Sequence, residues 1–212
     1  MPNKKKSIIT NIIILINILI FMYEIKKFGN TIIFGAASPK QLMSLGANYG
    51  NLSLTKEPQR LLYSMFLHVN LLHIFSNMFT LFLFGPALET RIEPLGYLFL
   101  YLLTGIAGNF ISSLMNPTIV AVGASGAIFG ILGALLFFSF FSPIKTHISF
   151  ILIFLLIFLN IGIGLKDPSI DINAHLGGLL TGLIVALIIF IIEKIFSFIT
   201  FIFKKIVKFY SH

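Results

Sequence analysis

Long apolar segments separated by short polar breaks run along most of this 212-residue chain. A helix that crosses a membrane needs about 20 mostly apolar residues. The stretch from Leu95 to Ile144 contains no charged residue, and proline or charged residues stand in the breaks, where helices are expected to end. The pattern predicts six membrane-crossing helices, near residues 8–23, 69–86, 95–115, 124–141, 147–165 and 174–192.

The composition favours the same fold class. Hydrophobic residues make up 57% of the chain, charged residues only 10%, and the mean hydropathy is +1.00. Soluble domains usually contain about a quarter charged residues. The chain has no cysteine, so disulfides are excluded and the redox compartment cannot be inferred. We therefore predict an all-α polytopic membrane protein in which residues 1–192 form a single membrane domain.

Positive charge is concentrated at the ends of the apolar segments. The net charge is +8, and cations in such positions orient helices and meet anionic lipid headgroups, so we exclude nucleic acid as a partner. Residues 4–6 are three lysines, which predict a cytoplasmic N-terminus, and six crossings would return the C-terminus to the same side. The segment 24–60 carries five basic residues, which argue mildly against this orientation.

Both ends of the chain carry further expectations. The N-terminal apolar segment has no small-residue cleavage site after it, so we expect it to be a retained helix. No organelle-targeting segment precedes it, and we expect a prokaryotic cell membrane as the location. The C-terminal residues 193–212 are basic and aromatic. They are expected to lie along the inner membrane interface, although a plain continuation of the sixth helix is the alternative.

Polar side chains within apolar segments are energetically expensive and are therefore functional candidates. A spacing of four places two of them, His73 and Asn77, on one helix face. Each candidate alone also has a structural explanation, because serine, asparagine and glycine commonly pack helices together in membranes. Gly178 and Gly182 fit such a close-packed face. The candidates are His68, His73, Asn77, Ser125 and His175.

Taken together, these side chains supply what acyl transfer needs. The Ser125 hydroxyl can act as the nucleophile, and a neutral His175 imidazole can take its proton and later return it to the leaving amine. The polar pair on the second helix, with backbone N–H groups at a helix N-terminus, can stabilise the oxyanion. Glycines around the serine allow a substrate to approach the backbone.

Other classes of membrane protein fit less well. A transporter or channel would be expected to carry charges within its spans, or paired discontinuous helices. A metal site built from His68, His73 and His175 is conceivable, but it has no carboxylate and no H-E-x-x-H motif accompanies it. The two aspartates, Asp167 and Asp171, share one loop and cannot form a dyad across two helices. We expect no metal and no cofactor.

Three short motifs resemble the signature segments of the rhomboid intramembrane serine proteases. They are "HVNLLHIFSN" at 68–77, "GASGAIFG" at 123–130 and "AHLGG" at 174–178. Their order agrees with the family, in the second, fourth and sixth helices of a six-helix bundle. The segment 83–109 also resembles the family, and the likeness covers roughly residues 60–192.

The resemblance implies a serine endopeptidase that cuts the transmembrane segments of single-span membrane proteins. Ser125 and His175 would form a dyad without an acidic member. His73 and Asn77 would line the oxyanion hole together with the backbone N–H of Ser125, and Gly123 would keep the approach open. A rhomboid-like protein that binds membrane clients without cutting them is the alternative.

The resemblance also assigns supporting positions. Phe129 stands where many relatives have tyrosine, and its ring would stack on the base. His68 is assigned from its position at the outer mouth of the second helix instead, where it would organise the cavity or water access, or extend to the membrane interface. The segment 24–60 would be a lateral loop lying partly in the membrane; many relatives have Trp-Arg there, whereas this chain has Gln59 and Arg60 and no tryptophan. The loop 166–171 would cap the site.

Overall fold

The computed structural model of the protein describes residues 7–141 and 149–210, and these residues are mostly helical. The predicted charge at residues 4–6 and the start of the predicted helix 147–165 lie outside the described residues. In chain order the elements are α1 (Ile8–Phe28), α2 (Thr31–Phe34), α3 (Pro39–Met43), β1 (Asn48–Tyr49), α4 (Gly50–Ser53), α5 (Arg60–Tyr63), the 3₁₀ helix η1 (Ser64–Phe66), α6 (Leu71–Met115), β2 (Val120–Ala121), α7 (Ser125–Phe141), α8 (Phe150–Gly164) and α9 (Ile172–Tyr210).

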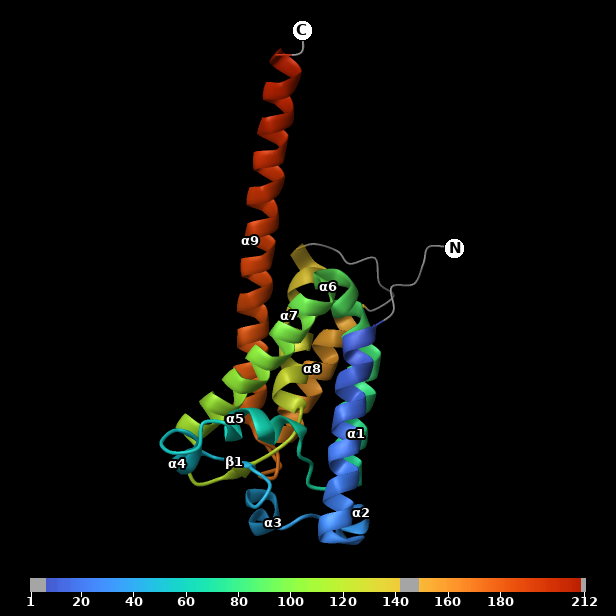
Figure 1. Cartoon of the computed structure of the whole chain (residues 1–212), viewed down its shortest axis with the longest axis vertical. Coiled ribbons are helices and arrows are strands. Elements are labelled where there is room, and N and C mark those ends of the chain that lie inside the picture. Colours follow the sequence, from blue (N-terminus) through green and yellow to red (C-terminus); the bar gives the residue numbers. More distant parts are fainter. Residues whose placement is uncertain (1–6, 142–148, 211–212) are drawn as a thin grey trace.

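Three of the described helices, α1, α6 and α9, are long and apolar enough to cross a membrane, and α7 and α8 are shorter apolar helices. The helix α6 has a break at Glu93, where φ is 64° and ψ is 158°, directly before Pro94. Its first half lies beside α1 and its second half returns towards β1 (Figure 1). The predicted break at 89–94 is therefore present, and the predicted mostly helical membrane fold is confirmed. The count of six crossings stays a prediction.

The two ends of the bundle differ in what they hold. The short elements α2 to α5 gather at one end, where α7 and α9 also begin (Figure 1). At the opposite end α1 begins and α9 ends, and the last part of α9 extends beyond the other helices (Figure 1). Residues 193–210 thus continue α9 as a helix. The predicted all-α class needs one correction: among the described residues, Asn48–Tyr49 and Val120–Ala121 form a pair of two-residue antiparallel strands.

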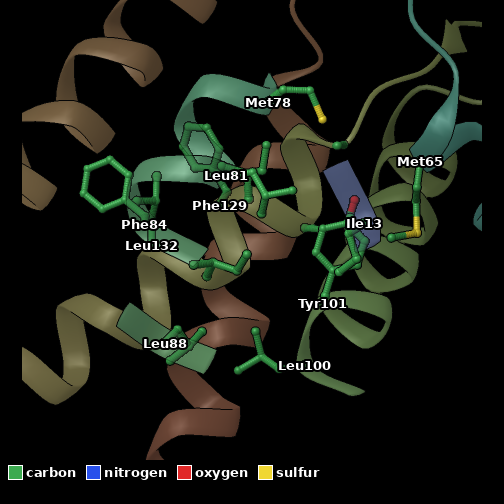
Figure 2. Packing of buried hydrophobic residues seen from close by; sticks show 14 of the residues in the cluster. Ile13, Met65, Met78, Leu81, Phe84, Leu88, Leu100, Tyr101, Phe129 and Leu132 are labelled. Carbon is green, nitrogen blue, oxygen red and sulfur yellow. The ribbon is translucent and has the colours of Figure 1, made fainter. Parts of the chain in front are cut away.

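The central helix is α7, which packs against α6, α8 and α9. Every residue from Gly126 to Leu135 is buried. Figure 2 shows Phe129 and Leu132 of this helix in the same cluster of buried side chains as Leu81 and Phe84 of α6. These side chains form the apolar interior next to which the polar candidates lie.

Glycines bring α7 and α9 into backbone contact. A Cβ atom on Gly178 would overlap the carbonyl oxygen of Gly126, and one on Gly182 would overlap the carbonyl oxygen of Gly130. Within each helix the two glycines are four residues apart, so they lie one turn apart on the surface that faces the other helix. Such a small-residue seam is a common way for membrane helices to approach closely. We call these four residues the glycine seam.

A buried carboxylate attaches α1 to α6. Glu89 accepts hydrogen bonds from the Thr10 hydroxyl at 2.7 Å, from the Thr10 backbone N–H at 2.9 Å and from the Ile9 backbone N–H at 2.9 Å. The first N–H groups of a helix have no partner within the helix, and a negative charge is favourable beside them. Glu89 thus caps the first turn of α1 from a neighbouring helix.

Two polar side chains hold the segment between α1 and α6 in place without a tryptophan. Arg60 donates to the backbone oxygens of Met43 and Ala47, at 3.0 Å each, and pairs with Glu57 at 2.8 Å. Asn109 of α6 donates to the Leu61 carbonyl at 2.8 Å and to the Ser64 hydroxyl at 2.9 Å. Three backbone oxygens of this irregular segment thus receive side-chain hydrogen bonds, as burial requires.

We predict that Gly182→Ala destabilises the bundle, because the added methyl group meets the Gly130 carbonyl and forces α7 and α9 apart. Overpacking of this kind costs about 1–3 kcal/mol. Thermal unfolding in detergent should show a midpoint several degrees below that of the unmodified protein. The matched control is Gly162→Ala in α8, where nothing lies within 4 Å of an added Cβ. Alanine there should leave the midpoint unchanged or raise it slightly, since it favours a helix over glycine by about 0.5–1 kcal/mol; equal midpoints for the two variants would contradict the seam.

Candidate active site

Ser125 is the first residue of α7, and the three residues 122–124 connect it to β2. The backbone N–H of Gly123 donates to the Ser64 carbonyl at 2.9 Å, which fixes the segment against η1. Gly123 has a φ of +126°, a backbone conformation that residues with a Cβ atom rarely adopt. The chain therefore turns sharply before the serine and presents it at the N-terminus of a buried helix.

His175 lies in the first turn of α9 and contacts the serine. Its Nε2 atom is 2.8 Å from the Ser125 Oγ atom, although 50 positions separate the two residues in the sequence. His175 is buried, with 7% of its surface exposed. When Nε2 carries no hydrogen, the serine hydroxyl donates to it, which is the arrangement a general base requires.

An aromatic ring orients the imidazole. The Phe129 and His175 rings are stacked, with centroids 4.3 Å apart and planes 10° from parallel. Phe129 follows Ser125 by one helical turn, so the serine and the ring approach the histidine from the same helix. The other ring nitrogen, Nδ1 of His175, is buried and has no hydrogen-bond partner among the described residues. Stacking and the serine contact therefore fix the ring without a carboxylate.

The start of α9 is held by Asp171, whose structural role the sequence reasoning missed. One carboxylate oxygen accepts from the Ala174 backbone N–H at 3.1 Å, and the other bonds the Ser112 hydroxyl of α6. The His175 backbone N–H donates to the Asp171 carbonyl at 3.2 Å. Aspartate directly before a helix is a typical N-cap, and that signal is visible in the sequence.

The two polar side chains predicted on α6 lie beside Gly123. A Cβ atom on Gly123 would be 2.7 Å from His73 Cε1, 2.8 Å from His73 Nε2 and 3.5 Å from Asn77 Nδ2. Any side chain at this position would collide with the histidine ring. The structure thus brings His73 and Asn77 beside Gly123, which precedes Ser125 by two residues.

His68 is fully buried, so it does not extend to the membrane interface. Its Nε2 atom lies 3.1 Å from Asn77 Nδ2, and its ring meets the His73 ring edge-on at a centroid distance of 5.0 Å. When Nε2 carries no hydrogen it accepts from the amide, which orients the Asn77 side chain. His68 therefore contacts both Asn77 and His73 of α6.

A second residue missed by the sequence reasoning is Glu24, which is completely buried near the end of α1. Its Oε1 atom accepts from the His68 backbone N–H at 3.2 Å, whereas Oε2 has no partner among the described residues. The apolar segment was predicted to end at residue 23, which placed this carboxylate just outside the helix. Its hydrogen bond links α1 to the residue that contacts Asn77.

The loop before α9 holds a charged turn at Asp167. The Asp167 carboxylate accepts from the backbone N–H and hydroxyl of Ser169, and these hydrogen bonds hold the pKa of Asp167 below its usual value. Among residues 7–141 and 149–210, no group of three histidine, aspartate or glutamate side chains is close enough to hold a metal ion.

Comparison of the sequence with known proteins identifies its family. The sequence profile described as Rhomboid domain matches residues 55–192, more than half of the chain. "Rhomboid protease GluP" of Bacillus subtilis (strain 168) is 35% identical over 125 residues, covering 56% of this chain and 24% of that protein. "Putative rhomboid protease YdcA" of the same organism is 41% identical over 83 residues, covering 39% and 42%.

A plant relative extends the comparison beyond bacteria. "RHOMBOID-like protein 6, mitochondrial" of Arabidopsis thaliana is 35% identical over 104 residues, covering 49% of this chain and 34% of that protein. The matched region is thus less than half the length of each of these three relatives. The profile match nevertheless spans the segments that carry Asn77, Ser125 and His175, and on this evidence the chain belongs to the rhomboid family.

Proposed function

We propose that this protein is an intramembrane serine endopeptidase that cleaves transmembrane segments of single-span membrane proteins. The observation that carries the proposal is the 2.8 Å contact between Ser125 Oγ and His175 Nε2, formed across α7 and α9 within a Rhomboid domain. The names of two relatives, which describe them as a protease and a putative protease, support the same activity.

The reaction begins at the serine. His175 takes the hydroxyl proton as Ser125 Oγ attacks the scissile carbonyl, and the imidazolium then gives this proton to the leaving amine. The acyl group remains on the serine as an ester. A water molecule, activated by the same imidazole, hydrolyses the ester and returns the enzyme to its starting state. The contact of His175 with Phe129 keeps the ring in one orientation through both steps.

The oxyanion formed in each step is stabilised at the N-terminus of α7. The backbone N–H of Ser125 has no partner within its own helix turn and is available to the developing charge. His73 and Asn77, beside Gly123, supply side-chain donors from α6. Preorganised donors in a site shielded from water are usually the largest single contribution to such catalysis.

The proposed placement in the membrane has six crossings: α1, the two halves of α6, α7, α8 and the first part of α9. The start of α1 and the end of α9 lie at the same end of the bundle (Figure 1), which supports one side of the membrane for both, and the basic residues of the sequence favour the cytoplasm for that side. The site, at the opposite end beside α2–α5, then faces the outer side of the cell membrane. A substrate helix would enter it laterally from the bilayer.

We predict that a fluorophosphonate probe forms a covalent adduct on Ser125 in the detergent-purified protein. Ser125→Ala removes the nucleophile and His175→Ala removes its base, so both variants should lose labelling. The matched control is Ser139→Ala in the same helix, whose hydroxyl donates only to the Leu136 carbonyl; it should label at the unmodified rate. Peptide mass spectrometry locates the adduct.

Absence of an adduct in the unmodified protein, while another rhomboid protease labels in the same detergent, would contradict the proposal. It would favour the alternative, a rhomboid-like protein that binds membrane clients without cutting them. Labelling that persists in His175→Ala would show that the histidine is not the base.

We further predict that Asn77→Ala slows turnover of a reconstituted single-span substrate by about 10²-fold, because it removes one of several oxyanion donors. The loss should appear in kcat, since the donor acts on the transition state. Asn160→Ala in α8 is the matched control, because this amide donates to the Leu156 carbonyl one turn before it in the same helix. Turnover of Asn77→Ala at the unmodified rate would exclude the amide from the oxyanion hole.

A further inference from the structure

The helix α9 is much longer than a membrane crossing requires. Its 39 residues extend for about 58 Å at 1.5 Å per residue, whereas the hydrocarbon core of a bilayer is about 30 Å thick. The second part of α9 projects beyond the other helices (Figure 1). Close to half of this helix is therefore available for something other than the crossing.

An ion pair marks the level at which the bundle ends. Both carboxylate oxygens of Glu193 lie 2.6 Å from the guanidinium nitrogens of Arg91, and the same guanidinium lies over the Phe138 ring at 4.2 Å. Arg91 stands two residues before Glu93, where α6 reverses direction. Residues after Glu193 thus lie past the turn that joins the two halves of α6.

The segment 194–207 separates apolar from polar side chains around the helix. At about 100° per residue, its apolar positions occupy roughly half of the circumference. The opposite arc carries Lys194, Ser197, Thr200, Lys204 and Lys205, with Phe201 as the one large apolar residue among them. The apolar arc consists of Ile195, Phe196, Phe198, Ile199, Ile202, Phe203, Ile206 and Val207, each between 39% and 71% exposed.

Two features of this segment indicate what covers the apolar arc. An arc of half the circumference is wider than the narrow seam of a two-stranded coiled coil and is typical of a helix embedded in a membrane surface. The polar arc, on the side of the helix opposite the inserted face, carries three lysines and no acidic residue. Lysine in this position complements acidic phospholipid headgroups.

We propose that residues 194–207 dock on the acidic phospholipid surface of the bilayer that holds the bundle, with the apolar arc inserted and the lysines at the headgroups. In the structure α9 continues as one unbroken helix to Tyr210 (Figure 1), so docking requires its axis to bend towards the membrane plane after Glu193, where the packing of α9 against the bundle ends. The docked segment braces α9, the helix that carries His175, at its cytoplasmic end. This inference does not depend on the proposed protease activity.

The absence of cysteine from the chain allows a sharp test. Single substitutions Ile199→Cys and Thr200→Cys place an environment-sensitive NBD dye on adjacent residues at the same height, one on the apolar arc and one on the polar arc. The full-length variants are reconstituted into phosphatidylcholine vesicles with added phosphatidylglycerol and with doxyl-labelled lipids as quenchers. We expect the dye at 199 to be quenched several-fold more than the dye at 200.

The lipid and lysine dependence completes the experiment. In vesicles of phosphatidylcholine alone, or with Lys204→Gln and Lys205→Gln combined, the difference in quenching between positions 199 and 200 should fall several-fold. A difference that is insensitive to both changes would overturn the role of acidic lipid.

Two other outcomes would overturn the docking itself. Equal, weak quenching at 199 and 200 would mean that the segment stands in water as a straight extension. Disulfide-linked dimers of Ile199→Cys under oxidant, with a dye environment that depends on the protein-to-lipid ratio, would mean that a second copy of the chain covers the apolar arc. Circular dichroism of each variant controls for loss of the helix.

Discussion

The backbone contact between α7 and α9 is the interaction on which the rest of the structure depends. In a bilayer, helices associate through packing and hydrogen bonds, because the lipid is as apolar as their side chains. The glycine seam lets two backbones meet where any side chain would hold them apart. Ser125 precedes the seam glycine Gly126 of α7 by one residue, and His175 precedes the seam glycine Gly178 of α9 by three. The register of the seam therefore sets the distance between the two side chains.

Hydrogen bonds from α6 complete the arrangement by fixing the ends of the other elements. Glu89 caps α1, Asn109 holds the segment before α6, and Ser112 bonds the aspartate that caps α9. Each contact satisfies a buried polar group that would be costly to leave unpaired. The helix α6 thus carries His73 and Asn77, the side-chain donors of the candidate oxyanion hole, and also holds the ends of the neighbouring elements.

The apolar segments were sufficient to predict the main helices and the break at Glu93, because hydropathy and proline report directly on burial and helix ends. They did not decide whether residues 193–212 leave the last helix or continue it, since the lysines at 194, 204, 205 and 208 suit both a helix end and an amphipathic extension. Two-residue strands such as Asn48–Tyr49 leave no periodic pattern to detect.

The candidate site was predictable to a different degree. A spacing of four was enough to place His73 and Asn77 on one helix face. Short motifs singled out Ser125 and His175. The hydrogen bond from His68 to Glu24 was not predictable, because it joins residues 44 positions apart and the carboxylate lay beyond the predicted end of its helix. The stacking of Phe129 on His175 was expected from the family resemblance, but its geometry depends on the closeness of α7 and α9.

The most direct test of this account is the rate at which Ser125 reacts with a fluorophosphonate probe in Gly178→Ala, measured at a temperature where the variant is folded. The added methyl group meets the Gly126 carbonyl, one residue from the serine, and Gly162→Ala serves as the control. If the seam sets the contact between Ser125 and His175, the Gly178 variant reacts much more slowly than the control while it keeps its helical content. Equal rates for the two folded variants would contradict the account, because the reactive pair would then not depend on the approach of α7 and α9.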